Sequence, residues 1–141
     1  MDDVPHARPP RPLVLTALAV LLWLEAAALV AVTAWLLVEL VTAQAGSAAG
    51  GLAIVVFAAL AAVWLGITAF ATLRGRAWIR GSAVTWQVLQ IAIAAGFFQG
   101  ADARPGLAWT LLVPALVGIA LVLTPGVVRA TARIRDGGPQ D

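Results

Sequence analysis

The stretch LVLTALAVLLWLEAAALVAVTAWLLVELVTA, from Leu13 to Ala43, decides the fold class. It is apolar except for threonines, tryptophans and two carboxylates, Glu25 and Glu39. About 20 helical residues cross a bilayer core of roughly 30 Å, so this run is long enough to span a membrane. Because the run also continues far beyond the apolar region of a secretory signal, we expect an uncleaved transmembrane helix.

Three more apolar runs, at 52–73, 81–99 and 106–123, extend the same pattern through most of the chain. Of the 141 residues 62% are hydrophobic and 11% are charged, whereas soluble domains have about 25% charged residues. The sequence therefore predicts an all-α integral membrane four-helix bundle, a multi-pass protein of the plasma membrane. We expect the transmembrane domain to cover 13–123, between a proline-rich tail (1–12) and a tail with a short basic segment (124–141), with the TPG sequence after residue 123 ending or bending the last span.

The basic residues, all nine of which are Arg, predict the orientation. Eight lie in the N-terminal tail, the connector RGRAWIR and the C-terminal segment, and only Arg104 lies on the opposite side. Under the positive-inside rule both termini should be cytoplasmic. The same side chains are expected to contact anionic lipid headgroups, and no nucleic-acid partner is predicted. The arginines assigned to topology and headgroup contacts are Arg74, Arg76, Arg80, Arg129 and Arg133.

A carboxylate inside the first span needs a polar partner. Glu25 lies about 18 Å along the helix from Leu13, and an ionised carboxylate at such depth costs at least about 2.5 kcal/mol. Gln87 and Gln90 are three residues apart on one face of the third span, which runs parallel to the first, so they lie at a comparable depth. We therefore predict a hydrogen bond from Glu25 to Gln87 or Gln90.

Two interpretations of this polar cluster remain open. It can be a structural clasp, since a hydrogen bond between membrane helices stabilises by about 0.6–2 kcal/mol. It can also be a protonatable site for proton-coupled transport or ligand binding, a common role of intramembrane carboxylates. A third arrangement satisfies the glutamate through another subunit.

Small residues spaced by four predict close helix packing. Ala58, Ala62 and Gly66 form one such stripe, and Ala92, Gly96 and Gly100 form another. Because such stripes allow helix backbones to approach each other, we expect contacts within the bundle in preference to a dimer interface.

Signals of catalysis are missing from the sequence. The chain contains no cysteine, and its single histidine, His6, lies in the proline-rich tail, so neither a Cys/His metal site nor a Ser–His–Asp arrangement is expected. We predict no catalytic, cofactor-binding or metal-ligating residues. The predicted function is a non-enzymatic accessory or scaffold component of a membrane assembly, with a membrane protein partner or a homo-oligomer; the alternative is a small proton-coupled transporter that uses Glu25.

The stretch LRGRAWIRGSAVTWQVLQ, from Leu73 to Gln90, resembles a group of small four-span actinobacterial integral membrane proteins. The resemblance covers the four-span layout loosely and this stretch more closely, and it implies no activity, because none is assigned to the group. The residues that carry it are Arg76, Trp78, Arg80, Ala83 and Gln87.

Glu25 is also similar in position to the essential first-span glutamate of the small multidrug resistance transporters. The surrounding LWLEAAAL does not follow their pattern. The arginine bias also argues against the antiparallel dimers that a weak charge bias permits in that family. The resemblance implies proton-coupled export, which is the alternative function.

Overall fold

The computed structural model describes residues 13–42, 48–99 and 103–132, and these parts of the chain form helices without any strand. The first four helices are long and apolar enough to cross a membrane, which confirms the predicted all-α four-helix membrane bundle. The proposed N-terminal tail (1–12) and residues 133–141 of the proposed C-terminal tail (124–141) lie outside the described residues. In chain order the helices are α1 (Leu13–Thr42), α2 (Ala48–Leu73), α3 (Ile79–Phe98), α4 (Pro105–Leu123) and α5 (Pro125–Ala132).

The start of α2 lies four residues before the predicted position 52. Gly50 and Gly51, which precede the predicted start, are part of the helix. A β-carbon added at Gly51 would lie 2.6 Å from Leu40 Cδ1, so α1 and α2 approach each other closely at this point. Gly51 leaves room for the end of the Leu40 side chain, which a larger residue would displace. Sequence composition does not distinguish such a packing glycine from a turn glycine.

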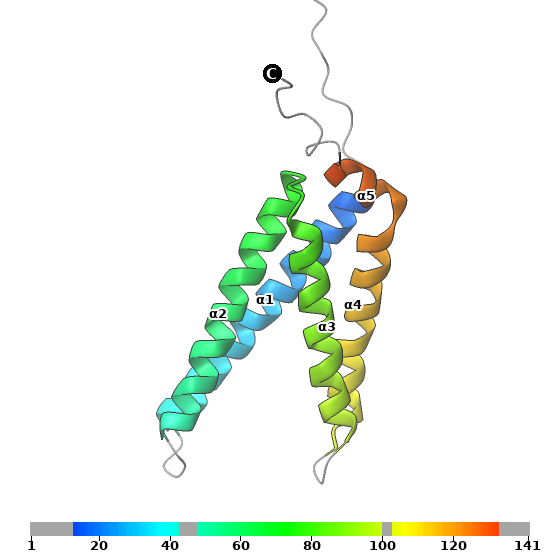
Figure 1. The fold of residues 1–141 in the computed structure, drawn as a ribbon. Coiled ribbons are helices and arrows are strands. Elements are labelled where there is room, and N and C mark those ends of the chain that lie inside the picture. Colours follow the sequence, from blue (N-terminus) through cyan, green and yellow to red (C-terminus); the bar gives the residue numbers. More distant parts are fainter. Residues whose placement is uncertain (1–12, 43–47, 100–102, 133–141) are drawn as a thin grey trace, which may run out of the picture.

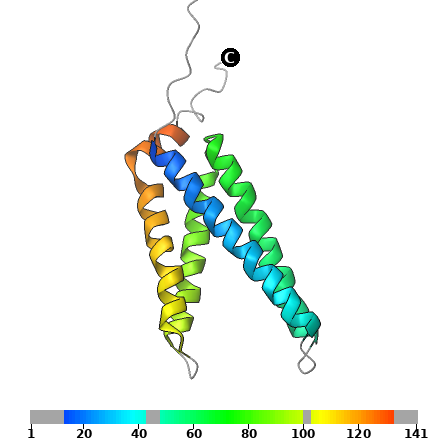
Figure 2. The ribbon, with the colours of Figure 1, turned by 180° about the vertical axis from the view of Figure 1, so that it is seen from behind.

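The four long helices form two antiparallel hairpins, and the hairpins diverge (Figures 1 and 2). In the first hairpin α1 packs along α2, and in the second α3 packs along α4. The hairpins meet at the end that carries α5 and separate toward the other end, as Figure 1 shows. The main hydrophobic core lies where they meet, and it comprises Leu15, Leu18, Leu22, Ala26, Leu65, Ala69, Ala71, Ile79, Ala83, Trp86, Val122 and Val127.

The connector between the hairpins is short because α2 ends in a tight cap. Gly75 has a φ of 66°, a left-handed conformation that glycine adopts without steric cost. The Gly75 N–H donates to the Thr72 carbonyl at 3.0 Å, and the Arg76 N–H donates to the Ala71 carbonyl at 3.4 Å. This pair of bonds is a Schellman motif, which satisfies the last carbonyl groups of α2. The motif turns the chain directly into α3.

The last span ends at Leu123, as the TPG sequence predicts. The Thr124 hydroxyl donates to the Leu121 carbonyl at 2.6 Å, and Pro125 begins α5. Val127 is fully buried in the main core, so α5 packs across the end of the bundle. Arg129 on the same short helix is exposed.

The packing predicted for the small-residue stripe of α3 is wrong. Ala92 and Gly96 are exposed, and a β-carbon added at Gly96 would meet nothing within 4 Å. The buried face of α3 instead follows Ala83, Gln87, Gln90 and Ala94, which lie on another side of the helix. Gly100 lies outside the described residues.

The stripe of α2 is only partly used. Ala62 is buried, but a β-carbon added at Gly66 would also lie in open space. In an alanine-rich chain a spacing of four recurs on every face of a helix. The spacing alone therefore does not identify the face that packs.

Candidate functional site in the membrane interior

The carboxylate of Glu25 is buried because Glu25 lies on the core face of α1. Leu18, Leu22 and Ala26 occupy the same face at helical spacing and are also buried. Only 8% of the Glu25 surface is exposed. The side chain therefore points into the protein at the level where the two hairpins meet.

The second hairpin supplies the hydrogen-bond donors. Trp86 Nε1 donates to Glu25 Oε2 at 3.0 Å, and Gln87 Nε2 donates to the same oxygen at 3.3 Å. The Gln90 side chain, 4% exposed, lies beside the same carboxylate. The structure thus brings Glu25, Gln87 and Gln90 together, and we call these residues with Trp86 the Glu25 cluster.

Trp86 is the member of the cluster that the sequence reasoning missed. It is buried, and its ring packs edge to face against Trp64 of α2, with centroids 6.2 Å apart and an angle of 83°. A buried indole N–H usually finds an acceptor. Trp86 precedes Gln87 and lies one turn before Gln90, so its position on the polar face of α3 was the available signal.

A glycine of α4 makes room for the cluster. A β-carbon added at Gly118 would lie 2.5 Å from Gln87 Cδ, a distance that real β-carbons do not reach. Gln87 itself is 0% exposed. Its amide is therefore confined between the backbone of α4 and the carboxylate of α1. Sequence reasoning gave Gly118 no role.

A second polar contact joins the hairpins nearer to α5. The hydroxyl oxygens of Thr68 in α2 and Ser82 in α3 are 2.8 Å apart. Since the Thr68 hydroxyl donates its hydrogen to the Trp64 carbonyl at 2.9 Å, Ser82 is the donor in the contact between the two hydroxyls. Polar contacts therefore connect α3 with both helices of the first hairpin.

The hydrogen bonds of the Glu25 cluster are distributed unevenly over its oxygens. Both donors from α3 bond to Oε2, whereas Glu25 Oε1, Gln87 Oε1 and Gln90 Oε1 are buried and accept no hydrogen bond. No ion pair between Glu25 and an arginine occurs within the described ranges. The cluster is therefore suited to receive a hydrogen-bond donor or a positive charge. Among the same residues, no three His, Asp or Glu side chains gather as a protein metal site would require.

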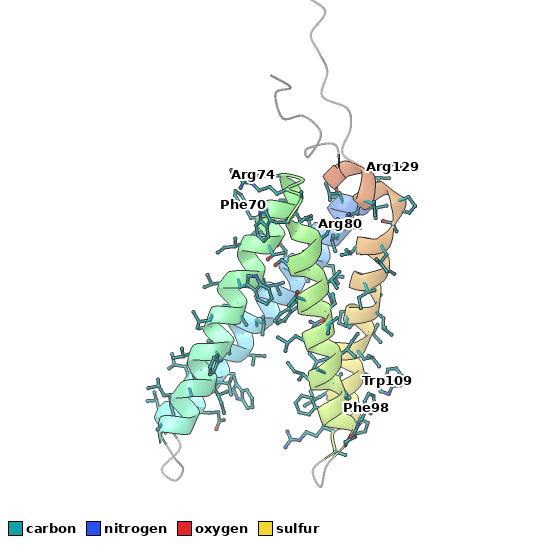
Figure 3. All side chains as sticks on the ribbon, viewed as in Figure 1. Phe70, Arg74, Arg80, Phe98, Trp109 and Arg129 are labelled. Carbon is teal, nitrogen blue, oxygen red and sulfur yellow. The ribbon has the colours of Figure 1, made fainter. Side chains whose placement is uncertain are left out.

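The arginines expected at headgroup level lie at the α5 end. Figure 3 shows Arg74, Arg80 and Arg129 at this end, and Trp109 with Phe98 at the opposite end. The Arg74 guanidinium carbon lies 4.4 Å from the centre of the Phe70 ring, a cation–π contact. Arg76 is exposed, and Arg133 lies outside the described residues.

At the opposite end, Phe98 and Trp109 pack edge to face at 5.6 Å and join α3 to α4. Trp109 is also exposed, as expected for a ring at a membrane interface. The aromatic pair therefore closes the second hairpin where the two hairpins are apart. Comparison of the chain with protein-family models, with curated proteins and with solved structures finds no match.

Proposed function

We propose that the chain is a non-enzymatic accessory or scaffold component of a membrane assembly in the plasma membrane. The observation that supports this role best is that the buried polar groups form hydrogen bonds between the two hairpins. The bonds of Glu25 to α3 and the contact of Thr68 with Ser82 join two preformed hairpins at one end. A scaffold needs such a fixed angle between elements that present apolar faces to lipid or to a partner.

The proposed orientation places the α5 end in the cytoplasm. Arg74, Arg80 and Arg129 gather there (Figure 3), and their charges favour the side with anionic headgroups. Reporter fusions after Arg76 and after Gln140 should therefore report the cytoplasm, and a fusion at Ser47 should report the outside. A reporter that is exported after Arg76 would contradict this orientation.

The diverging halves of the hairpins are the proposed contact surface for the assembly. Trp35 and Val41 of α1 and Phe57 of α2 are exposed large apolar side chains in this part.

The test of this surface is chemical cross-linking in native membranes followed by purification in mild detergent. Trp35→Ala with Phe57→Ala should remove a stoichiometric cross-linked species. Val20→Ala with Ile67→Ala, exposed residues near the hairpin junction, should retain it. Loss in both double variants, or in neither, would contradict the proposed surface.

A second candidate function is proton-coupled transport through Glu25. The position of Glu25 favours this function, because its carboxylate is buried at the junction from which the hairpins diverge. A change in the hydrogen bonds of Glu25 would alter the contact between the two hairpins. Transport predicts that purified protein in liposomes moves protons together with a substrate and that Glu25→Gln abolishes this movement. Toxic-cation resistance in cells provides the first substrate screen.

A further inference from the structure

The unpaired oxygens of the Glu25 cluster define a ligand class. Glu25 Oε1, Gln87 Oε1 and Gln90 Oε1 are each buried without a donor, in side chains that are 8%, 0% and 4% exposed. The Gln87 amide donates to Oε2 of the same carboxylate, and the Gln90 amide is a further hydrogen-bonding neighbour of this carboxylate. A ligand that suits these oxygens must bring a hydrogen to donate or a positive charge.

We propose that Glu25, Gln87 and Gln90 form a binding site for one proton, held on Glu25 Oε1 and donated to a glutamine amide oxygen. A hydronium ion transfers its proton to Oε1 and leaves as water, so an O–H bond forms at Oε1 and the charge of the site changes from minus one to zero. The former acceptor becomes a donor, while Oε2 keeps its bonds from Trp86 and Gln87. The use of this proton in transport rests on the second candidate function, whereas binding of the proton does not.

The charged groups around the site supply no alternative partner. The described residues of α2 and of α4 include no acidic or basic side chain. The other carboxylate of α1, Glu39, is exposed and lies about 21 Å further along the helix. Arg80 lies in the first turn of α3 and Arg129 lies on α5, and both are at the α5 end of the bundle in Figure 3. An ionised Glu25 would therefore have no contacting countercharge among the described residues.

The number of oxygens favours a proton over a hard metal cation. The cluster offers the two carboxylate oxygens of Glu25 and one amide oxygen each from Gln87 and Gln90. One of these, Oε2, already accepts two hydrogen bonds. Calcium takes about 6–8 oxygen ligands, more than this cluster contains. A proton needs only Oε1 and one neighbouring acceptor.

Gly118 is a positioning residue for this site. The missing side chain at Gly118 leaves the space in which the Gln87 amide lies. A methyl group there displaces the amide and changes the hydrogen bonding of Glu25 without removing any titratable group. Gly66 is the matched control, because it is also a helical glycine and an added β-carbon at this position meets nothing within 4 Å.

The experiment is infrared difference spectroscopy of the full chain in detergent, recorded between acidic and alkaline buffers. The wild type should show a carboxylic C=O band that is lost in Glu25→Gln and retained in Glu39→Gln. Gly118→Ala should shift this band to higher frequency, because the hydrogen bond of the acid is weakened, and Gly66→Ala should leave it unchanged. If Gly118→Ala does not fold, the double variant with Gln87→Ala restores the space and should show the shifted band.

Three results would overturn the proposal. One is the absence of any band that depends on Glu25. Another is a band that responds to sodium concentration at fixed pH, which would assign the site to a metal cation. The third is a band that is equal in wild type, Gly118→Ala and Gln90→Ala, which would exclude both glutamines as its partner. A Glu25 band in a protein without transport would reject the second candidate function and keep the proton site.

Discussion

At the scale of single residues, Glu25 is the side chain whose chemistry has the largest effect. Its Oε2 accepts bonds from Trp86 and Gln87, whereas its Oε1 accepts none. A neutral group of the same shape fits this site if it accepts hydrogen bonds at the position of Oε2 and donates one at the position of Oε1. Glutamine is such a group, and alanine is not.

We therefore expect Glu25→Gln to retain the stability of the bundle and Glu25→Ala to lower its free energy of unfolding by about 1–2 kcal/mol. The measurement is thermal unfolding in detergent, with Glu39→Gln as the control at an exposed position of the same helix. Equal destabilisation by Gln and by Ala would show that the cluster requires the carboxyl group itself.

The indole N–H of Trp86 allows a narrower test. Trp86→Phe keeps an aromatic ring against Trp64 but removes the donor to Glu25 Oε2. We expect a loss of about 1–2 kcal/mol in unfolding free energy, the cost of a missing bond to a buried polar group. Trp78→Phe, at a largely exposed position, should change stability by less than about 0.5 kcal/mol. Urea unfolding in mixed micelles measures both values, and equal losses would mean that the N–H bond of Trp86 does not contribute to stability.

At the scale of the elements, the apolar runs predict the helices well because a span is fixed by local hydropathy. The pairing of Glu25 with glutamines of α3 was also accessible, since depth along two parallel spans follows from residue count. For Trp86 the sequence offered only its place on the polar face of α3, and for Gly118 it offered no signal. Their roles depend on how α3 and α4 are rotated about their own axes, and such rotation is set by contacts between distant parts of the chain.

The cap of α2 gives a prediction at this scale. Gly75→Ala places a β-carbon in a left-handed conformation, which costs roughly 1–2 kcal/mol. Gly81→Ala, in the first turns of α3, meets nothing within 4 Å and should be neutral or stabilising by up to about 1 kcal/mol. Thermal unfolding of the two variants side by side measures the difference. A stability ranking in the opposite order would contradict the Schellman cap.

At the scale of the whole molecule, the two hairpins meet at one end, through the main core, the Glu25 cluster and the contact of Thr68 with Ser82. Because the chain has no cysteine, paired spin labels can be introduced without background. Labels at Val41 of α1 and Leu107 of α4, both exposed, report the separation of the diverging ends. Pulsed electron paramagnetic resonance should give a broader distance distribution for Glu25→Ala than for wild type and an unchanged one for Glu25→Gln. A distribution that is the same in all three proteins would show that the Glu25 cluster does not set the angle.

The divergence of the hairpins also affects the surrounding lipid. A body that is narrow where α5 closes it and wide at the other end occupies unequal areas in the two leaflets (Figures 1 and 2). Lipids must compensate for this difference in area, and in a flat bilayer the lateral pressure then differs between the two leaflets. We therefore expect many copies in one patch to bend the membrane toward the narrow end, with a curvature that follows from the angle between the hairpins.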